Sequence, residues 1–417
     1  MSTDPARPSS PASAVERNRL WARLSDAVAR HEEPLATPVM VVDLDAFAAN
    51  AADLVRRAAG TPIRVASKSL RVPALISRAL AHPGFAGVLG YTLAEALWLE
   101  GEGISDDIVV AYPTVDRAAL TRLVGSPSAA AHITLMVDSV DHLDVIDSVR
   151  SSRAVPIRVA IDLDAGLDLR VTRIGPRRSP VRSADDALAL ARAIASRPGF
   201  RLVGVMTYEG QVAGVPDDVP GQRIRSALVR TLKDRSIEQL LGRRATVVEG
   251  LHDLLGAGGL EFWNAGGSGS IESSASDPVV TEVTAGSGLL VSGLFDHYRS
   301  FSPRPAAFYG LPVTRRPDPS TATVHGGGLV ASGAAGPDRL PIPWAPAGLS
   351  LTGLEGAGEV QTPLVGETAS RLRVGDLVWF RHAKSGELFE HTTTAHLVAG
   401  GRIIDSVPTY RGHGLAF

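Results

Sequence analysis

Lys68 has the sequence context of a reactive lysine. A short strand-forming run that starts at Pro62 ends in this lysine, and apolar residues at helical spacing begin at Val72. In a barrel of alternating strands and helices, the carboxyl ends of the strands form the active face. A partly desolvated lysine at such a strand end loses its proton at low cost and can form a Schiff base with an aldehyde. A solvated surface lysine fits the same pattern, and the local sequence alone favours that alternative.

A glycine- and serine-rich run follows a later strand-forming segment. Backbone N–H groups and serine hydroxyls in such a turn make a cradle for a phosphate group, and phosphate sites after late strands recur in barrels. The alternative interpretation is a flexible turn between a strand and a helix. The run consists of Gly266, Gly267, Ser268, Gly269 and Ser270.

Arg173 lies beyond a predicted strand end, in a loop that also contains paired acidic residues. An arginine there can hold a ligand nitrogen or a carboxylate, although composition alone favours a surface ion pair. The histidines of the C-terminal third form neither H-E-x-x-H nor another strong metal spacing. No G-x-S-x-G motif of a hydrolase is present.

A regular alternation of strands and helices is expected to position these residues. Nine strands with intervening helices favour a parallel (β/α)8 barrel, with one strand outside it or wrongly assigned. A doubly wound open sheet is the main competitor, and the lack of G-x-G-x-x-G after an early strand makes it less favourable. The expected strands cover residues 37–43, 62–67, 85–90, 108–111, 133–137, 157–163, 202–207, 261–264 and 279–284.

The composition and the hydrophobic pattern of the chain change near Ala285. Glycine and proline become more frequent from there on, and apolar residues no longer recur at helical spacing. Short strand-like runs follow, and Gly400-Gly401 between the last two indicates a hairpin turn. We therefore expect four parts. They are a disordered N-terminus over residues 1–14, a helix within 15–35 that could pack on the β domain, a barrel over 36–284, and a mostly β domain over 285–417.

The composition is that of a globular protein of more than one domain. The 417 residues are 44% hydrophobic and 21% charged, and the formal net charge is −2 with basic and acidic residues well mixed. No basic patch indicates nucleic acid as a partner, and no apolar run is long enough for a membrane span. The absence of cysteine excludes disulfides, thiolate nucleophiles and Cys-ligated zinc, and a cytoplasmic location is the expectation.

Five short motifs occur in order along the chain: Thr37-Pro38, Asp43-Leu44-Asp45, Lys68 between two serines, Arg173-Ile174-Gly175, and the run from Gly266 to Ser270. Together they resemble the D-threonine aldolase and D-serine dehydratase-like family, which are pyridoxal-phosphate enzymes with the alanine-racemase type of barrel. The resemblance extends from about residue 36 to the C-terminus. It implies an α/β fold, a (β/α)8 barrel of alanine-racemase type followed by a mostly β domain.

The resemblance also implies roles for individual residues. Lys68 would carry pyridoxal 5'-phosphate as a Schiff base, and Arg173 would face the pyridine nitrogen, where a fixed cation weakens the ring as an electron sink. The residues from Gly266 to Ser270 would hold the phosphate. Tyr208 falls where the family has a tyrosine near the cofactor.

Two departures from the family pattern concern the substrate side of the site. Leu70 stands where the family has a histidine, and Lys384 stands where it has the second ligand of a metal pair that begins at His382. A protonated lysine has no lone pair for a divalent metal. Either Glu387 replaces it as the ligand beside His382, or no metal binds and the ammonium supplies positive charge, which we favour.

The resulting functional hypothesis is a pyridoxal-phosphate lyase that cleaves a small β-hydroxy D-amino acid to glycine and an aldehyde. His382 is the expected acid–base group, with Lys384 assisting electrostatically. A dehydratase that releases a keto acid and ammonia is the first alternative. An amino-acid racemase, a non-catalytic pyridoxal-phosphate carrier and a cofactor-free Schiff-base aldolase also remain. The resemblance leaves room for a homodimer, because in this barrel type a second subunit often completes the site.

Overall fold

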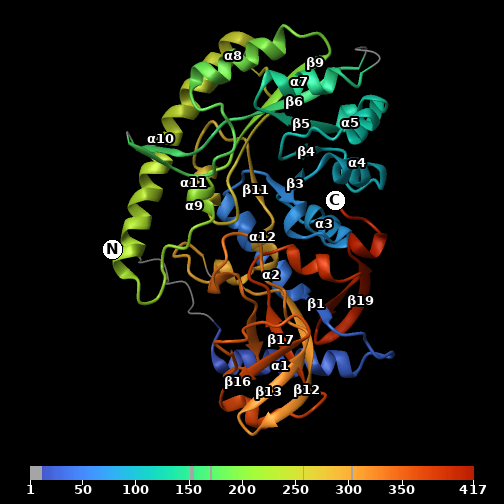
Figure 1. Cartoon of the computed structure of the whole chain (residues 1–417). Helices are drawn as coiled ribbons and strands as arrows, with labels where there is room; N and C mark the ends of the chain where they lie inside the picture. Colours follow the sequence, from blue (N-terminus) through green and yellow to red (C-terminus); the bar gives the residue numbers. More distant parts are fainter. Residues whose placement is uncertain (1–11, 151–154, 170, 257, 302–303) are drawn as a thin grey trace.

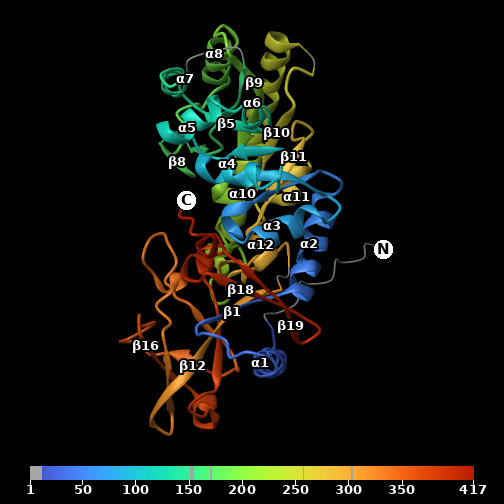
Figure 2. The same ribbon diagram turned by 90° about the vertical axis from the view of Figure 1, so that its right-hand side faces the viewer.

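The computed structural model of the chain describes residues 12–150, 155–169, 171–256, 258–301 and 304–417. The expectation of disorder over residues 1–14 falls mainly on residues 1–11, which lie outside the described part. Helix α1 (Ala14–Ala29) begins soon after them. The described chain forms an upper lobe of helices around parallel strands and a lower lobe dominated by long antiparallel strands (Figures 1 and 2).

Eight parallel strands of the upper lobe close into a barrel, in the order β10-β11-β2-β3-β4-β5-β6-β9. The predicted (β/α)8 barrel is therefore confirmed, and each barrel strand coincides with an expected strand. The barrel strands are β2 (Ile63–Ala66), β3 (Phe85–Gly90), β4 (Ile108–Val110), β5 (Ile133–Val137), β6 (Ile157–Asp162), β9 (Phe200–Thr207), β10 (Phe262–Ala265) and β11 (Glu282–Ala285).

Helices follow the barrel strands and cover the outside of the barrel (Figure 1). A small hairpin, β7 (Leu167–Leu169) and β8 (Thr172–Ile174), is inserted between β6 and β9. The helices of this lobe are α2 (Leu44–Ala58), α3 (Pro73–Leu80), α4 (Leu93–Gly101), α5 (Arg117–Val124), α6 (Pro127–His132), α7 (Val140–Asp147), α8 (Ala184–Ala195), α9 (Gly210–Ala213), α10 (Arg223–Leu255), α11 (Ile271–Ala275) and α12 (Ser287–Leu290).

The first of the nine expected strands, residues 37–43, forms β1 (Val39–Asp43), which lies in the sheet of the lower lobe and not in the barrel. It pairs antiparallel with β12 (Ala307–Asp318) and parallel with β18 (Thr394–Ala399). The chain thus begins in the β lobe, runs through the barrel and returns. The remaining strands of this sheet are β13 (Thr321–His325), β14 (Ile342–Ala345), β15 (Ser350–Leu351), β16 (Gln361–Val365), β17 (Leu377–Arg381) and β19 (Arg402–Pro408).

Helix α1 packs on this sheet. A capping box between Ser13 and Glu16 starts the helix, and its buried Leu24 contacts an apolar cluster that includes Trp344 and Trp379. The indole Nε1 of Trp21 donates a hydrogen bond of 2.7 Å to the carbonyl oxygen of Leu377. The N-terminal helix and the C-terminal strands therefore form one packed unit, although more than 300 residues separate them in sequence.

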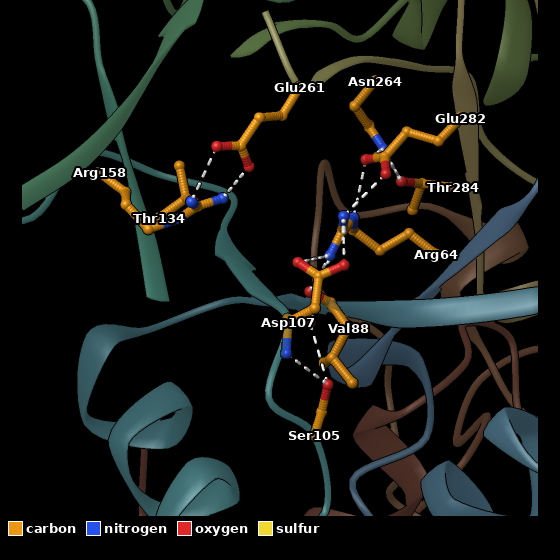
Figure 3. Close-up of polar contacts among 10 residues, drawn as sticks. All are labelled: Arg64, Val88, Ser105, Asp107, Thr134, Arg158, Glu261, Asn264, Glu282 and Thr284. Carbon is orange, nitrogen blue, oxygen red and sulfur yellow. Dashed lines mark hydrogen bonds and ion pairs between the residues drawn. The ribbon is translucent and has the colours of Figure 1, made fainter. Parts of the chain in front are cut away.

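The barrel interior is apolar in one part and ionic in another. Val109 belongs to an apolar cluster separate from the main core, whereas its neighbours Ile108 and Val110 belong to that core. Because successive side chains of a strand point to opposite faces, Val109 faces the barrel interior. By the same alternation Arg64 points inward, where it contacts Glu282 of β11 (Figure 3).

Within the described residues, no helix combines the length and apolarity needed to cross a membrane.

Candidate active site

A cavity of about 240 Å³ lies at the carboxyl ends of the barrel strands. Residues at or just after β2, β3, β4, β9, β10 and β11 line it. The β lobe contributes Lys384 and Ser385, which follow β17. The cavity therefore lies between the barrel and the β lobe, at the end where barrel enzymes place their chemistry.

Lys68 lines this cavity from a short 3-10 turn, Ser67–Ser69, directly after β2. The side chain of Ser67 is fully buried and donates a hydrogen bond of 3.1 Å to the carbonyl oxygen of Leu89, which anchors the turn to β3. The ammonium Nζ of Lys68 donates a hydrogen bond of 3.0 Å to the phenol oxygen of Tyr112. The lysine is thus held at the strand end and directed toward the residue that follows β4.

The β lobe meets Lys68 at a glycine. Gly386 has a φ of +91°, and a Cβ added to it would lie 2.0 Å from the carbonyl oxygen of Lys68. Both the backbone conformation and the close approach require glycine at this position. The loop that carries Lys384 is therefore packed directly on the lysine turn.

The charged groups that line the cavity are all cationic. Lys68, Arg178 and Lys384 are among its lining residues, and no aspartate or glutamate of the described chain is. The guanidinium carbon of Arg178 lies 5.7 Å from the ring centre of Tyr112 and 5.4 Å from that of Tyr208. No ion pair joins Arg178 to a carboxylate among the described residues. Such an excess of positive charge suits an anionic ligand.

The two tyrosines beside Arg178 have opposite pKa shifts. Burial acts to raise the pKa of Tyr112, but the positive charges of Lys68, Arg178 and Lys384 outweigh it and hold this pKa below its ordinary value. The pKa of Tyr208 is raised, because burial there outweighs the effect of Arg178. Of the two phenols, Tyr112 is the one that ionises more readily.

The glycine-rich run forms the tight turn that its sequence predicts, between β10 and α11. Gly266, Gly267 and Ser268 line the cavity, whereas Gly269 and Ser270 are not among its lining residues. Gly266 has a φ of +82°, and a Cβ on Gly269 would lie 2.2 Å from the carbonyl oxygen of Ala213. The glycines of this turn therefore have no room for a side chain, whereas Ser268 and Ser270 fit with their side chains buried.

Buried serines support this turn. The hydroxyl of Ser268 accepts a hydrogen bond of 2.9 Å from the backbone N–H of Gly288, which joins the turn to α12. The hydroxyl of Ser270 donates a bond of 3.0 Å to the carboxylate of Glu209, which is itself paired with Arg244. Ser268 thus joins the cavity wall to its neighbouring elements, and Ser270 holds the turn from behind.

Arg173 lies apart from the cavity. It belongs to β8, its guanidinium forms an ion pair with the buried Asp164 between β6 and β7, and it is not among the lining residues. Arg178, five residues further along the same loop, lines the cavity instead. Sequence reasoning missed both Arg178 and Tyr112. Their available signals were a second arginine in the loop of Arg173 and a tyrosine directly beyond a strand end.

His382 lies behind the cavity wall. Its side chain is buried and its Nε2 is 3.3 Å from the hydroxyl of Ser385, a lining residue, whereas His382 itself does not line the cavity. Burial first, and then the charge of Arg381, lower the pKa of His382 to about 3. The imidazole is therefore neutral near pH 7.

Lys384 and Glu387 form an ion pair with an N–O distance of 3.1 Å. The ammonium of Lys384 also donates a hydrogen bond of 2.6 Å to the hydroxyl of Ser332, and Glu387 accepts one of 2.8 Å from the backbone N–H of Ser332. Among the residues with described positions, no three His, Asp or Glu side chains gather as a metal site. The carboxylate of Glu387 is engaged with Lys384 and Ser332.

Residues 42–246 match the family model of the alanine racemase N-terminal domain. A D-threonine aldolase from Arthrobacter sp is 28% identical over 270 residues, which are 63% of this chain and 63% of that relative. The chain thus spans slightly less than two thirds of the length of this curated relative.

Two solved structures share the fold. The D-threonine aldolase of Filomicrobium marinum superposes with a TM-score of 0.74 at 22% identity, covering 90% of this chain and 95% of the other. The D-threo-3-hydroxyaspartate dehydratase of Delftia sp. HT23 gives 0.69 at 19% identity, covering 90% and 97%. Residues 42–246 are therefore similar to the alanine racemase N-terminal domain, and the chain is similar to D-threonine aldolase over 63% of its length.

Proposed function

We propose that the chain is a pyridoxal-phosphate-dependent lyase that cleaves a small β-hydroxy D-amino acid to glycine and an aldehyde. The observation that carries this proposal is the position of Lys68 at a strand end, in a cavity that the described residues line with three cations and no carboxylate. The alanine racemase-type family and D-threonine aldolases depend on pyridoxal phosphate, and both are related to this chain.

The residues present fit this cofactor. The amine of Lys68 is available for its aldehyde, and the turn from Gly266 to Ser268 offers a narrow backbone cradle for its phosphate. Tyr208 and Arg178 also line the cavity, whereas Arg173 would reach it only by leaving Asp164. When bound, the cofactor supplies an electron sink that stabilises negative charge at the substrate's Cα.

The protein's own side chains have two tasks in this reaction. Arg178 offers an unpaired guanidinium to the substrate carboxylate, for which a planar fork of donors is well suited. The β-hydroxyl needs a group that exchanges its proton. Lys384 lines the cavity and is our first candidate for this proton exchange. His382 does not line the cavity and would act on the β-hydroxyl only through Ser385. A metal would require His382 and Glu387 to rearrange, because Glu387 is paired with Lys384.

Borohydride reduction tests the cofactor assignment. The purified protein should be yellow, and reduction should fix the chromophore on the peptide that contains Lys68, as mass spectrometry will show. Lys68→Ala should abolish this labelling. A colourless wild-type protein that takes up no added pyridoxal phosphate would refute the proposal.

A dehydratase is the second candidate function, and the fold shared with the Delftia dehydratase favours keeping it. Product analysis with D-threonine separates the reactions. Glycine and acetaldehyde indicate an aldolase, a keto acid with ammonia indicates a dehydratase, and an isomer of threonine indicates a racemase. Light scattering of the same preparation tests the homodimer that the resemblance leaves open.

A further inference from the structure

Tyr112 is the polar partner of the lysine that the proposed function depends on. Its phenol oxygen accepts a hydrogen bond of 3.0 Å from Nζ of Lys68, and no other hydrogen bond to this amine occurs within the described chain. The two residues come from different strand ends, since Lys68 follows β2 and Tyr112 follows β4. The barrel therefore brings together a phenol and an amine that lie 44 residues apart in sequence.

Several charged groups face Tyr112 from the elements packed around it. Lys68, Arg178 and Lys384 are cationic and favour the phenolate form. On its other side, Tyr112 shares a small cavity with Asp162 and Asp164. Asp164 is paired with Arg173, and burial together with the neighbouring Asp138 raises the pKa of Asp162 to about 7. Tyr208, with its raised pKa, completes the surroundings.

The cations dominate this balance, because the pKa of Tyr112 is lowered despite burial. Other bases near Lys68 are scarce. No aspartate, glutamate or histidine is among the described residues that line the cavity. The phenol oxygen of Tyr112 is consequently the basic atom that reaches Nζ of Lys68.

We propose that Tyr112 is a catalytic residue that exchanges a proton with Lys68. The phenolate oxygen accepts a proton from the ammonium, so that one N–H bond breaks, one O–H bond forms, and Nζ keeps the electron pair as a neutral amine. The neutral amine is the form that attacks an aldehyde. The reverse transfer returns the proton to Nζ when the lysine must leave again. This inference rests on the proposed function, because it concerns the lysine that would carry the cofactor.

The first test measures how fast the full-length protein, freed of cofactor, forms a Schiff base with added pyridoxal phosphate. Proton transfer by a positioned group contributes about 10²–10⁴ in rate, so Tyr112→Phe should slow this step about a hundredfold at pH 8. Tyr309→Phe is the matched control, because Tyr309 is a buried tyrosine of β12 that does not line the cavity. We expect the control to stay within about threefold of wild type. A small external base such as imidazole should partly restore the rate of Tyr112→Phe, which it would not do for a merely structural loss.

The second test needs no cofactor. Acetylation of Lys68 by acetic anhydride, followed by mass spectrometry, reports how readily the amine reacts. Tyr112→Phe should lower this labelling about tenfold at pH 8. The tyrosinate absorbance should show Tyr112 ionising below the ordinary pKa of a phenol, and Arg178→Met should raise this pKa.

The two tests separate the two hypotheses. If wild type takes up no pyridoxal phosphate, the proposed function fails, and the acetylation result still decides the role of Tyr112. If wild type takes it up and Tyr112→Phe equals Tyr309→Phe in both rate and acetylation, the inference is overturned and the proposed function stands. A Tyr112 that ionises at or above the ordinary phenol value would also overturn it.

Discussion

Arg64 lies at the centre of an ionic network inside the barrel (Figure 3). Its side chain is 3% exposed and donates two hydrogen bonds of 2.7 Å to the carboxylate of Glu282 and two more, of 2.9 and 3.0 Å, to that of Asp107. Burial acts to lower the pKa of Arg64, but these two carboxylates outweigh it and keep the guanidinium charged. The amide of Asn264, a cavity residue, also donates to Glu282. The network therefore supports the floor of the cavity.

We predict that Arg64→Ala destabilises the protein strongly. Asp107 is half-exposed and can turn to water, whereas the side chain of Glu282 is only 11% exposed and would keep a buried charge with Asn264 alone. Removing one partner of a buried ion pair costs about 3–5 kcal/mol. The cost arises from the charge left behind and not from the attraction alone. The double variant Arg64→Met with Glu282→Met removes both charges and should recover about half of the loss or more.

Urea unfolding followed by circular dichroism measures this effect. Arg201→Ala is the matched control, because Arg201 and Glu261 form an ion pair of 2.5 Å in which the side chains are 51% and 40% exposed, and Glu261 retains Arg158. Exposed pairs of this kind contribute about 0–1 kcal/mol. An Arg64→Ala protein that loses no more stability than Arg201→Ala, or a double variant less stable than Arg64→Ala, would refute the reasoning.

Three further predictions concern the phosphate turn, a buried carboxyl and the N-terminal helix. Gly269→Ala should weaken pyridoxal-phosphate binding about a hundredfold in a titration, because its Cβ meets the carbonyl of Ala213, whereas Gly242→Ala in α10 has free space and should leave binding unchanged. The pKa of Glu95 is raised to about 7, chiefly by burial, so the folded state binds the extra proton between about pH 4.5 and 7 and stability falls as the pH rises through this window. Glu95→Gln should flatten that fall in urea unfolding, and an unchanged slope would contradict the assignment. Leu24→Ala should lower the unfolding free energy by about 2–5 kcal/mol, since Leu24 is fully buried under the β lobe; a loss below 1 kcal/mol would show that α1 is dispensable.

The sequence predicted the barrel because each strand carries its own local signal. Runs such as Ile133–Val137 are fully buried and mostly apolar, and capping residues such as Thr92 and Ser183 start the helices. These signals depend on near neighbours in the chain and survive without tertiary information. No local pattern in the sequence indicates which sheet β1 joins. A buried strand has the same apolar pattern whether its partners are barrel strands or the C-terminal strands β12 and β18.

The site was predictable where a motif and its position coincide. Lys68 and the turn from Gly266 could be named because a strand end and a glycine run mark them locally. The choice between Arg173 and Arg178 could not be made, since both lie in one loop and only the ion pair with Asp164 separates them. Likewise, nothing in the sequence tells that His382 is buried behind Ser385 while Lys384 faces the cavity.

The sequence by itself determined the elements, the lysine at the end of β2 and the glycine-rich turn after β10, because strand, helix and turn preferences act over a few residues. Tertiary structure alone decided which side chains surround that lysine. Tyr112, Arg178 and Lys384 come from segments far apart in the chain. The packing of the β lobe against the closed barrel brings three cations, Lys68, Arg178 and Lys384, into one cavity. The lowered pKa of Tyr112 is a consequence of that closure, since it depends on distances between charges that no local pattern records.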